Sequence, residues 1–261
     1  MEIITSRENP VLKLYRKLSD SKKERLKYKM FVLEGLRIVT DALNENSGLK
    51  HLILTQQAFE KYQSEFSQAD LNNTRLIVIS NELGNRIAQT EKTQGVFAVC
   101  SMPEKIPLKL DRNGKYLILL NVQDPGNMGM IIRTADALGI DGIIASECCD
   151  LYNPKVIRST MGSIFRMKIF TEPDTDIIFS ELSGKNIKSF ASVIDSDALN
   201  INSVSFNGGC AVFIGNEGNG LPEEVSEKCT EKITIPMHGT INSLNAAMAA
   251  GIIMWELKRN E

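Results

Sequence analysis

Residues 235–259 read IPMHGTINSLNAAMAAGIIMWELKR and join a polar loop to a long apolar segment. Ser243 is a residue type that favours helix N-caps, which predicts a helix over 243–258 with Leu244 and Asn245 in its first turn. Residues 246–255 carry no polar side chain. That run is about half of the ~20 residues that span a bilayer. We therefore expect this helix to be buried by the core or by a second subunit.

Upstream of this stretch, apolar segments alternate with helical patterns, which predicts a mostly parallel sheet covered on both faces. Ligands of such sheets lie at the carboxyl ends of the strands. Strands are predicted at 116–122, 142–145, 167–170, 187–194, 210–215 and 232–235, and helices at 128–138, 154–159, 175–182, 222–229 and 243–258.

A smaller alternating α/β unit precedes this sheet, with a helix beginning at Pro10. The segment 102–113 has two prolines and mixed charges, which is typical of a linker. We therefore predict a first domain over 1–103, a linker over 104–114 and a second domain over 115–261. Strands of the first domain are predicted at 31–33, 51–54, 76–79 and 95–100, with helices at 38–43, 56–64 and 81–88.

The composition is that of an ordinary globular protein, with 43% hydrophobic and 24% charged residues. Five cysteines without CxxC spacing and two distant histidines indicate free thiols in a reducing cytosol and no metal site. No secretion signal or membrane span is expected. Residues 1–30 hold nine Lys or Arg against four Asp or Glu, a local charge of +5 that suits RNA or simply a solvated helix surface.

Two further segments follow predicted strands. Residues 121–133, NVQDPGNMGMIIR, form a strand end, a tight turn and a helix start near Asn127. Arg133 lies near the middle of that helix, where it either serves function or pairs with a carboxylate such as Asp136 or Glu217.

Residues 212–222, VFIGNEGNGLP, place three glycines in six residues after an apolar strand. Such a loop lets a ligand approach the backbone closely, or it is a plain turn. The spacing here is not the G-x-G-x-x-G of dinucleotide-binding folds. The first strand-turn-helix also lacks that fingerprint, which disfavours a nicotinamide-dependent oxidoreductase.

Taken together, NVQDPGNMGMIIRTADALG, FIGNEGNGLPEEV and IPMHGTINSLNAAMAAGI resemble the three ordered motifs of the SpoU (TrmH-like) branch of the SPOUT RNA methyltransferases. The segment NPKVIRSTMGSIFRMKIF resembles the link between the first two motifs. SRENPVLKL and FVLEGLRIVTDAL resemble the small substrate-binding domain of that family, which folds like ribosomal protein L30e. The resemblance covers nearly the whole chain.

The resemblance implies an α/β fold whose second domain is a trefoil-knotted SPOUT domain, beside the small L30e-like α/β domain. It also implies methyl transfer from S-adenosyl-L-methionine to a ribose 2′-hydroxyl of RNA, with no metal. The implied cofactor-binding residues are Gly215, Ile235, Met237 and Leu244, and the implied catalytic residues are Asn127, Arg133, Glu217, Ser243 and Asn245.

Each implied catalytic position has an expected role. Arg133 would bind the target phosphate or polarise the hydroxyl, because an arginine stays protonated. Asn127, Ser243 and Asn245 would orient ribose and loop, and Glu217 would hold Arg133 or Asn127 in place. Members of the family are homodimers paired through the knot region, with Arg133 of one subunit reaching the other's cofactor site.

The leading hypothesis is a cytoplasmic 2′-O-methyltransferase of structured RNA, with 23S rRNA preferred over tRNA as the substrate. The alternative from another class is a non-catalytic RNA-binding or ribosome-assembly protein that retains the fold. One departure is Asn242, where the family often has glutamate before Ser-Leu-Asn.

Overall fold

A computed structural model describes residues 3–67, 74–238 and 243–259 of the chain. The chain forms two compact units. Unit 1 contains Met1–Glu104 and Tyr152–Arg166, and unit 2 contains Lys105–Leu151 and Met167–Glu261. The segment Tyr152–Arg166 therefore clusters with unit 1, although it lies inside the second domain as bounded from the sequence. In the described part of the chain, no helix has the length and apolar content needed to cross a membrane.

Unit 1 is built on a mixed five-stranded sheet in the order β1-β4-β3-β5-β2, counted over its described residues. β1, β3 and β4 are parallel, and β5 runs antiparallel to both β3 and β2. The strands are β1 (Ile3–Ile4), β2 (Met30–Glu34), β3 (Leu49–Thr55), β4 (Arg75–Ile79) and β5 (Val96–Ser101). The helices are α1 (Pro10–Asp20), α2 (Lys22–Tyr28), α3 (Leu36–Asn44), α4 (Gln56–Ser67), α5 (Asn81–Ile87) and α7 (Pro154–Thr160), followed by the 3₁₀ turn η1 (Ser163–Phe165).

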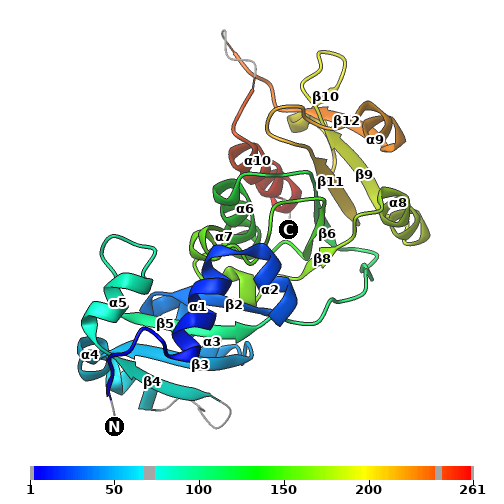
Figure 1. Cartoon of the computed structure of the whole chain (residues 1–261). Helices are drawn as coiled ribbons and strands as arrows, with labels where there is room; N and C mark the ends of the chain where they lie inside the picture. The colour runs from blue at the N-terminus through cyan, green and yellow to red at the C-terminus, as the bar shows by residue number, and fades with distance from the viewer. Residues whose placement is uncertain (1–2, 68–73, 239–242, 260–261) are drawn as a thin grey trace. The chain divides into compact units, whose positions relative to one another are not determined.

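The alternation of side chains along each strand gives unit 1 two cores, one on each face of its sheet. Along β2, Phe31 and Leu33 pack with α3, α4 and α7, whereas Val32 packs with α1 and α5. The sheet is thus covered on both sides by helices (Figure 1).

Unit 2 is built on a sheet whose strands are all parallel in its described residues, in the order β10-β12-β9-β11-β6-β7-β8. The predicted mostly parallel α/β fold is confirmed. The strands are β6 (Lys115–Leu120), β7 (Gly142–Ser146), β8 (Ile169–Thr171), β9 (Lys188–Ser192), β10 (Leu199–Asn200), β11 (Cys210–Ile214) and β12 (Glu231–Thr234). The helices are α6 (Pro125–Leu138), α8 (Thr175–Gly184), α9 (Glu223–Lys228) and α10 (Ala246–Lys258), with the 3₁₀ turn η2 (Ile201–Ser203).

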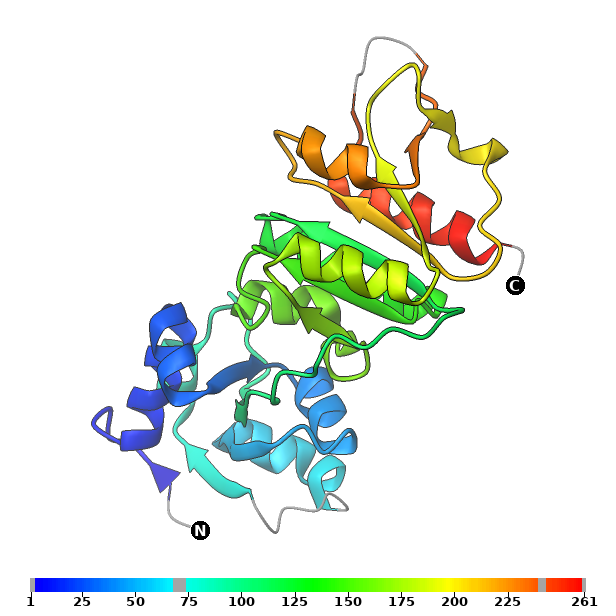
Figure 2. The same cartoon turned by 90° about the vertical axis from the view of Figure 1, so that its right-hand side faces the viewer.

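Helices cover both faces of this sheet, which is why its central strands are buried along their whole length. Every residue of β6 and β11 is buried, as expected for strands between two helical layers. α6 and α10 lie side by side on one face, and α8 and α9 lie on the other (Figures 1 and 2). The first turns of α6 and α10 lie at the carboxyl ends of the strands, where parallel sheets bind their ligands.

The start of α10 differs from the prediction. The helix begins at Ala246, and Asn245 is its N-cap, accepting hydrogen bonds from the backbone N–H groups of Ala247 (2.9 Å) and Met248 (3.3 Å). The predicted cap at Ser243 is wrong, and Ser243 and Leu244 precede the helix. Asn caps as well as Ser, and the residue directly before the apolar run holds the cap position.

Short elements are the other differences from the sequence-based expectation. The two-residue strands β1 and β10 and the separate helix α2 were not expected, because they are too short to produce a clear periodicity. The implied trefoil knot and the L30e-like character of unit 1 stay predictions. Asn242 lies outside the described residues.

Candidate functional site

Unit 2 contains a cavity of about 550 Å³ beyond the carboxyl ends of β9, β11 and β12, where parallel α/β sheets bind their ligands. All four residues predicted to bind the cofactor line it: Gly215, Ile235, Met237 and Leu244. The lining combines these groups with backbone from the loop that follows β11.

The glycine loop after β11 forms one wall of the cavity by folding back on itself. Asn216 and Gly220 exchange two backbone hydrogen bonds of 3.0 and 2.9 Å. A Cβ added to Gly215 would lie 2.1 Å from the carbonyl carbon and oxygen of Gly220, so no side chain fits there. Gly220 has φ +67°, which a glycine adopts without strain. Gly218 has ordinary space around it.

Glu217 joins this loop to the turn before α6. Its Oε1 accepts hydrogen bonds from the backbone N–H of Asp124 and from Asn127 Nδ2, both at 3.0 Å. Its Oε2 accepts from the backbone N–H of Gln123 at 3.2 Å. The side chain that was expected to hold Arg133 or Asn127 therefore holds Asn127.

Asn127 continues the network to α10. Its Oδ1 accepts a hydrogen bond of 2.9 Å from Asn245 Nδ2, while Asn245 Oδ1 caps α10. Asp124 in turn caps α6 by accepting from the Asn127 backbone N–H at 2.8 Å. The chain Glu217–Asn127–Asn245 thus fixes the first turns of α6 and α10 relative to the glycine loop. Three of the five predicted catalytic residues are brought together in this way.

The hydrogen bonds also set the charge state of Glu217. Partial burial alone would raise its pKa, but hydrogen bonds from Asn127 and from the backbone N–H groups of Asp124 and Gln123 outweigh burial and lower the pKa from its ordinary value. Glu217 is therefore ionised at neutral pH and is a weak proton acceptor. It is suited to orienting amide groups rather than to general-base catalysis.

The other two predicted catalytic residues lie outside this network. Ser243 lines the cavity beside Leu244. Arg133 is exposed on α6, one turn after the exposed Met130. Over residues 3–67, 74–238 and 243–259, its guanidinium makes no ion pair or hydrogen bond, so the considered pairing with Asp136 or Glu217 is not formed.

Two parts of the site were missed from the sequence. Asn216 Nδ2 donates to the backbone oxygen of Asn121 at 2.8 Å, and its Oδ1 accepts from the backbone N–H groups of Gly218 and Asn219. The tendency of Asn to bond to nearby backbone in turns was the available signal. Residues 192–194 also line the cavity. They lie at the end of a predicted strand, and that position was the signal that could have identified them.

Two thiols follow β7 near this site. Burial raises the pKa of Cys148 to about 11 and that of Cys149 to about 12. Both are therefore protonated at neutral pH, and neither is activated as a nucleophile.

The chain matches two family models. The SpoU rRNA Methylase family model matches residues 114–255, which include the cavity and the Glu217–Asn127–Asn245 network. The model of the MRM3-like substrate binding domain matches residues 9–98 in unit 1.

Known proteins resemble the chain over nearly its whole length. The 23S rRNA (guanosine(2553)-2′-O)-methyltransferase RlmP of Bacillus subtilis is 30% identical over 259 residues, covering 99% of this chain and 100% of that protein. An AdoMet-bound rRNA methyltransferase from Sinorhizobium meliloti has a TM-score of 0.87 and 28% identity, covering 99% of this chain and 98% of the other. The SpoU methyltransferase AviRb from Streptomyces viridochromogenes in complex with AdoMet has a TM-score of 0.84 and 26% identity, covering 97% and 98%.

Proposed function

We propose that this chain, which belongs to the SpoU rRNA Methylase family, transfers a methyl group from S-adenosylmethionine to a ribose 2′-hydroxyl of 23S rRNA. The observation that carries the proposal is the placement of the cavity against the Glu217–Asn127–Asn245 network. The glycine loop after β11 both lines the cavity and carries Glu217 of the network. The cofactor and the polar groups that would position a hydroxyl would therefore meet at this loop.

The residues around the cavity fit this cofactor. A volume of about 550 Å³ falls within the ~300–1,000 Å³ typical of ligand pockets. Ile235 and Leu244 offer apolar surface to an adenine ring, and the side-chain-free Gly215 exposes backbone groups to its polar edge. Met237 would pack beside these groups. S-adenosylmethionine supplies a methyl group on a sulfonium, which is an already activated leaving group.

Because the leaving group is activated, the tasks left to the protein are alignment of the hydroxyl and removal of its proton. Asn127, Ser243 and Asn245 would orient the ribose and the loop. Ionised Glu217 would keep Asn127 in its orientation. Arg133 would bind the target phosphate or polarise the hydroxyl, and the proton would pass to water or to an RNA phosphate.

The exposed position of Arg133 supports a homodimer in which it acts on the cofactor site of the other subunit. The same surface carries exposed apolar side chains on α6 and α10. Met130 is 46% exposed, Met248 56%, Ile252 37% and Trp255 58%. Such side chains on adjacent helices are typical of a protein interface. Burial of the terminal helix by a second subunit would occur at this surface, in the knot region.

The relatives and unit 1 support ribosomal RNA as the substrate. The B. subtilis relative is named for methylation of 23S rRNA, and residues 9–98 match a substrate-binding domain. The basic start of unit 1 would attract phosphates without reading sequence. Localisation in the cytoplasm, where ribosomes are assembled, would follow from this substrate and stays a prediction.

The direct test is transfer of a labelled methyl group to unmodified rRNA and, separately, to unmodified tRNA. We expect incorporation into 23S rRNA. Incorporation into tRNA alone would correct the substrate, and no incorporation into either RNA would overturn the enzyme assignment. If isothermal calorimetry then showed no S-adenosylmethionine binding, a non-catalytic RNA-binding protein would be the better account.

A further inference from the structure

Unit 1 contains a second cavity, of about 400 Å³, that the proposed reaction does not use. It lies at the carboxyl ends of the parallel strands β3 and β4, between α4, α5 and the loop before β5. Four amide side chains line it, those of Gln57, Asn81, Asn85 and Gln94, together with Lys61 and Tyr62. None of its described lining residues is acidic.

Hydrogen bonds to the backbone hold the walls of this cavity in place. Thr55 Oγ1 accepts from the backbone N–H of Ala58 at 3.1 Å, where α4 begins. Asn81 Oδ1 accepts from the backbone N–H of Gln57 at 3.2 Å, which ties α5 to α4. Gln94 Oε1 accepts from the backbone N–H of Leu36 at 2.9 Å. These bonds tie α5 to α4, and they tie the loop before β5 to the start of α3.

The same amides retain unused hydrogen-bonding groups. Within residues 3–67, 74–238 and 243–259, the side chains of Gln57 and Asn85 make no hydrogen bond, and the NH₂ groups of Asn81 and Gln94 make none either. An amide offers both donors and acceptors. Four of them around one cavity match the mixed donor and acceptor edge of a nucleobase.

The remaining lining residues suit the other parts of a nucleotide. Tyr62 is half-buried and presents an aromatic ring of the kind on which unpaired bases stack. Lys61 Nζ lies 5.0 Å from the centroid of that ring and adds a positive charge. The cavity volume is within the range of small-ligand sites.

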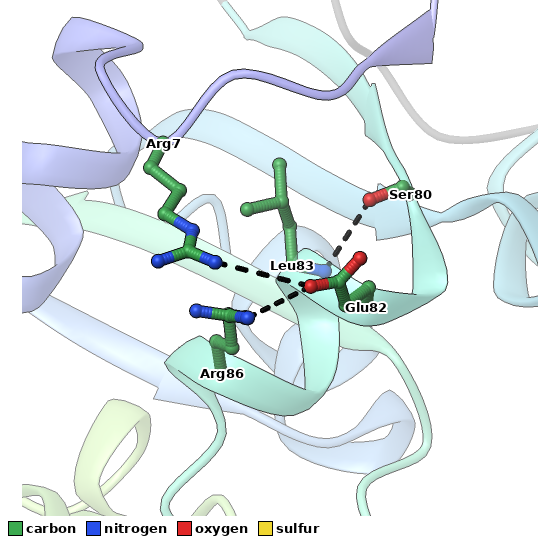
Figure 3. A network of polar contacts seen from close by, with 5 residues as sticks. All are labelled: Arg7, Ser80, Glu82, Leu83 and Arg86. Atoms are coloured by element: carbon green, nitrogen blue, oxygen red, sulfur yellow. Dashed lines mark hydrogen bonds and ion pairs between the residues drawn. The ribbon is translucent and has the colours of Figure 1, made fainter.

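Two arginines contact the same carboxylate on the adjacent face of α5. Arg7, from the loop before α1, and Arg86 both point toward Glu82 (Figure 3), with Nη2 to Oε1 distances of 4.0 and 2.8 Å. Successive helical residues are about 100° apart, so Glu82 and Arg86 flank the face that carries Asn81 and Asn85. Exposed ion pairs of this kind are weak, so a phosphate can compete with Glu82 for both guanidinium groups.

We propose that this cavity holds one unpaired nucleobase of the RNA substrate, while Arg7 and Arg86 contact the backbone phosphates beside it. The inference rests on the proposed function, in that it takes the ligand to be the RNA that is methylated. It names an unpaired base because bases within an RNA helix cannot enter a cavity, whereas loop and bulge bases can be splayed out. Unit 1 would thereby select a structural feature of the RNA other than the methylated ribose itself.

The test compares the double variant Gln57→Ala/Asn85→Ala with Gln63→Ala, an exposed amide on the same helix α4 but outside the cavity. The probes are filter binding of unmodified 23S rRNA transcribed in vitro, kcat and KM for methyl transfer, and calorimetry with S-adenosylmethionine. All three substituted positions are exposed, so the variants should fold.

For the double variant we expect the RNA Kd and KM to rise about tenfold, equivalent to about 1.4 kcal/mol, because the hydrogen bonds from two amides to the base are lost. We expect kcat and cofactor affinity to stay unchanged, and Gln63→Ala to behave as wild type. RNA affinity that is equal in the double variant and wild type would overturn the inference. Wild-type protein that binds the RNA but transfers no methyl group would refute the proposed function instead, while the affinity comparison would still decide the role of the cavity.

Discussion

Glu217 occupies the point where the glycine loop meets the two helices of the site. Hydrogen bonds from Asn127 and from two backbone N–H groups lower its pKa from the ordinary value of a glutamate. A carboxylate whose folded-state pKa is depressed stabilises the fold above its unfolded-state pKa, and that contribution is lost as the pH falls through the folded-state pKa.

We therefore expect Glu217→Gln to lose less stability than wild type when the pH is lowered from about 7 to about 3, through the range in which carboxylates titrate. Urea unfolding at both pH values measures the difference. Parallel losses of unfolding free energy in the two proteins would show that Glu217 titrates no differently in the folded and unfolded chains. Because the side chain is exposed, the effect should be small and is best measured at low ionic strength.

Gly215 offers a second residue-scale test. In Gly215→Ala the new methyl group would lie 2.1 Å from the backbone of Gly220, so the loop must move, at a cost of about 1–3 kcal/mol. We expect a lower unfolding free energy and weaker S-adenosylmethionine binding by calorimetry. Gly218→Ala is the matched control, because its nearest neighbour would be 3.5 Å away. Equal cofactor affinity in both variants would argue against a cavity wall at Gly215.

The sequence was informative about residues at this scale where the backbone is tightly constrained. All four residues that the family resemblance implied as cofactor-binding line one cavity. The resemblance singled them out, whereas the apolar pattern located only the strands around them. The partner of Arg133 could not be predicted, since helical spacing gives its position along α6 but not the direction of a long flexible side chain. The link from Asn216 to Asn121 joins segments that are distant in sequence, and no local pattern reports it.

At the scale of elements, α10 shows how a helix start can be misplaced by a few residues. Ser243 and Asn245 are both acceptable caps by residue type. The choice between them depends on tertiary contacts, and the hydrogen bond from Asn245 to Asn127 favours Asn245. Element boundaries were otherwise predicted well where buried strands or long apolar stripes defined them. The two-residue strands β1 and β10 were not predicted.

Variants at Asn245 separate capping from the polar network. Asn245→Ala should lose about 0.5–2 kcal/mol of unfolding free energy through the missing cap, together with most of the methyl transfer. Asn245→Ser should recover the stability, because serine also caps, but not the transfer, because the shorter side chain does not reach Asn127. Recovery of both would show that the contact with Asn127 is dispensable.

Ser243→Ala serves as the control for that pair. Since Ser243 is not the cap of α10 but lines the cavity, thermal unfolding should match that of wild type. A loss of stability comparable with that of Asn245→Ala would contradict the observed helix start.

At the scale of the whole molecule, the proposed dimer makes the site depend on two chains. Trp255 is 58% exposed on a helix with two further exposed apolar side chains. Trp255→Glu would place a charge in the proposed interface, so we expect sedimentation to show monomers and transfer to fall with dissociation. A variant that still forms dimers as tightly as wild type would exclude this surface from the interface.

Mixing two impaired variants, one without Arg133 and one with weakened cofactor binding, tests whether Arg133 acts across that interface. Arg133→Ala should abolish transfer while the dimer stays intact, because the side chain is exposed and makes no bond within the described part of its own chain. Mixed with Gly215→Ala under conditions of subunit exchange, it should regain part of the activity, since one site of each mixed dimer would have both functional parts. No recovery, with mixed dimers present, would place Arg133 at the cofactor site of its own subunit.

The cavity and the Glu217–Asn127–Asn245 network are proposed to perform ribose methylation of ribosomal RNA together. The most direct measurement is mass spectrometry of nucleosides released from unmodified 23S rRNA after incubation with the wild-type protein and S-adenosylmethionine. A single 2′-O-methylated nucleoside, absent when Arg133→Ala replaces wild type, is the predicted result. A methyl group found on a base, or no methylated nucleoside at all, would contradict the account.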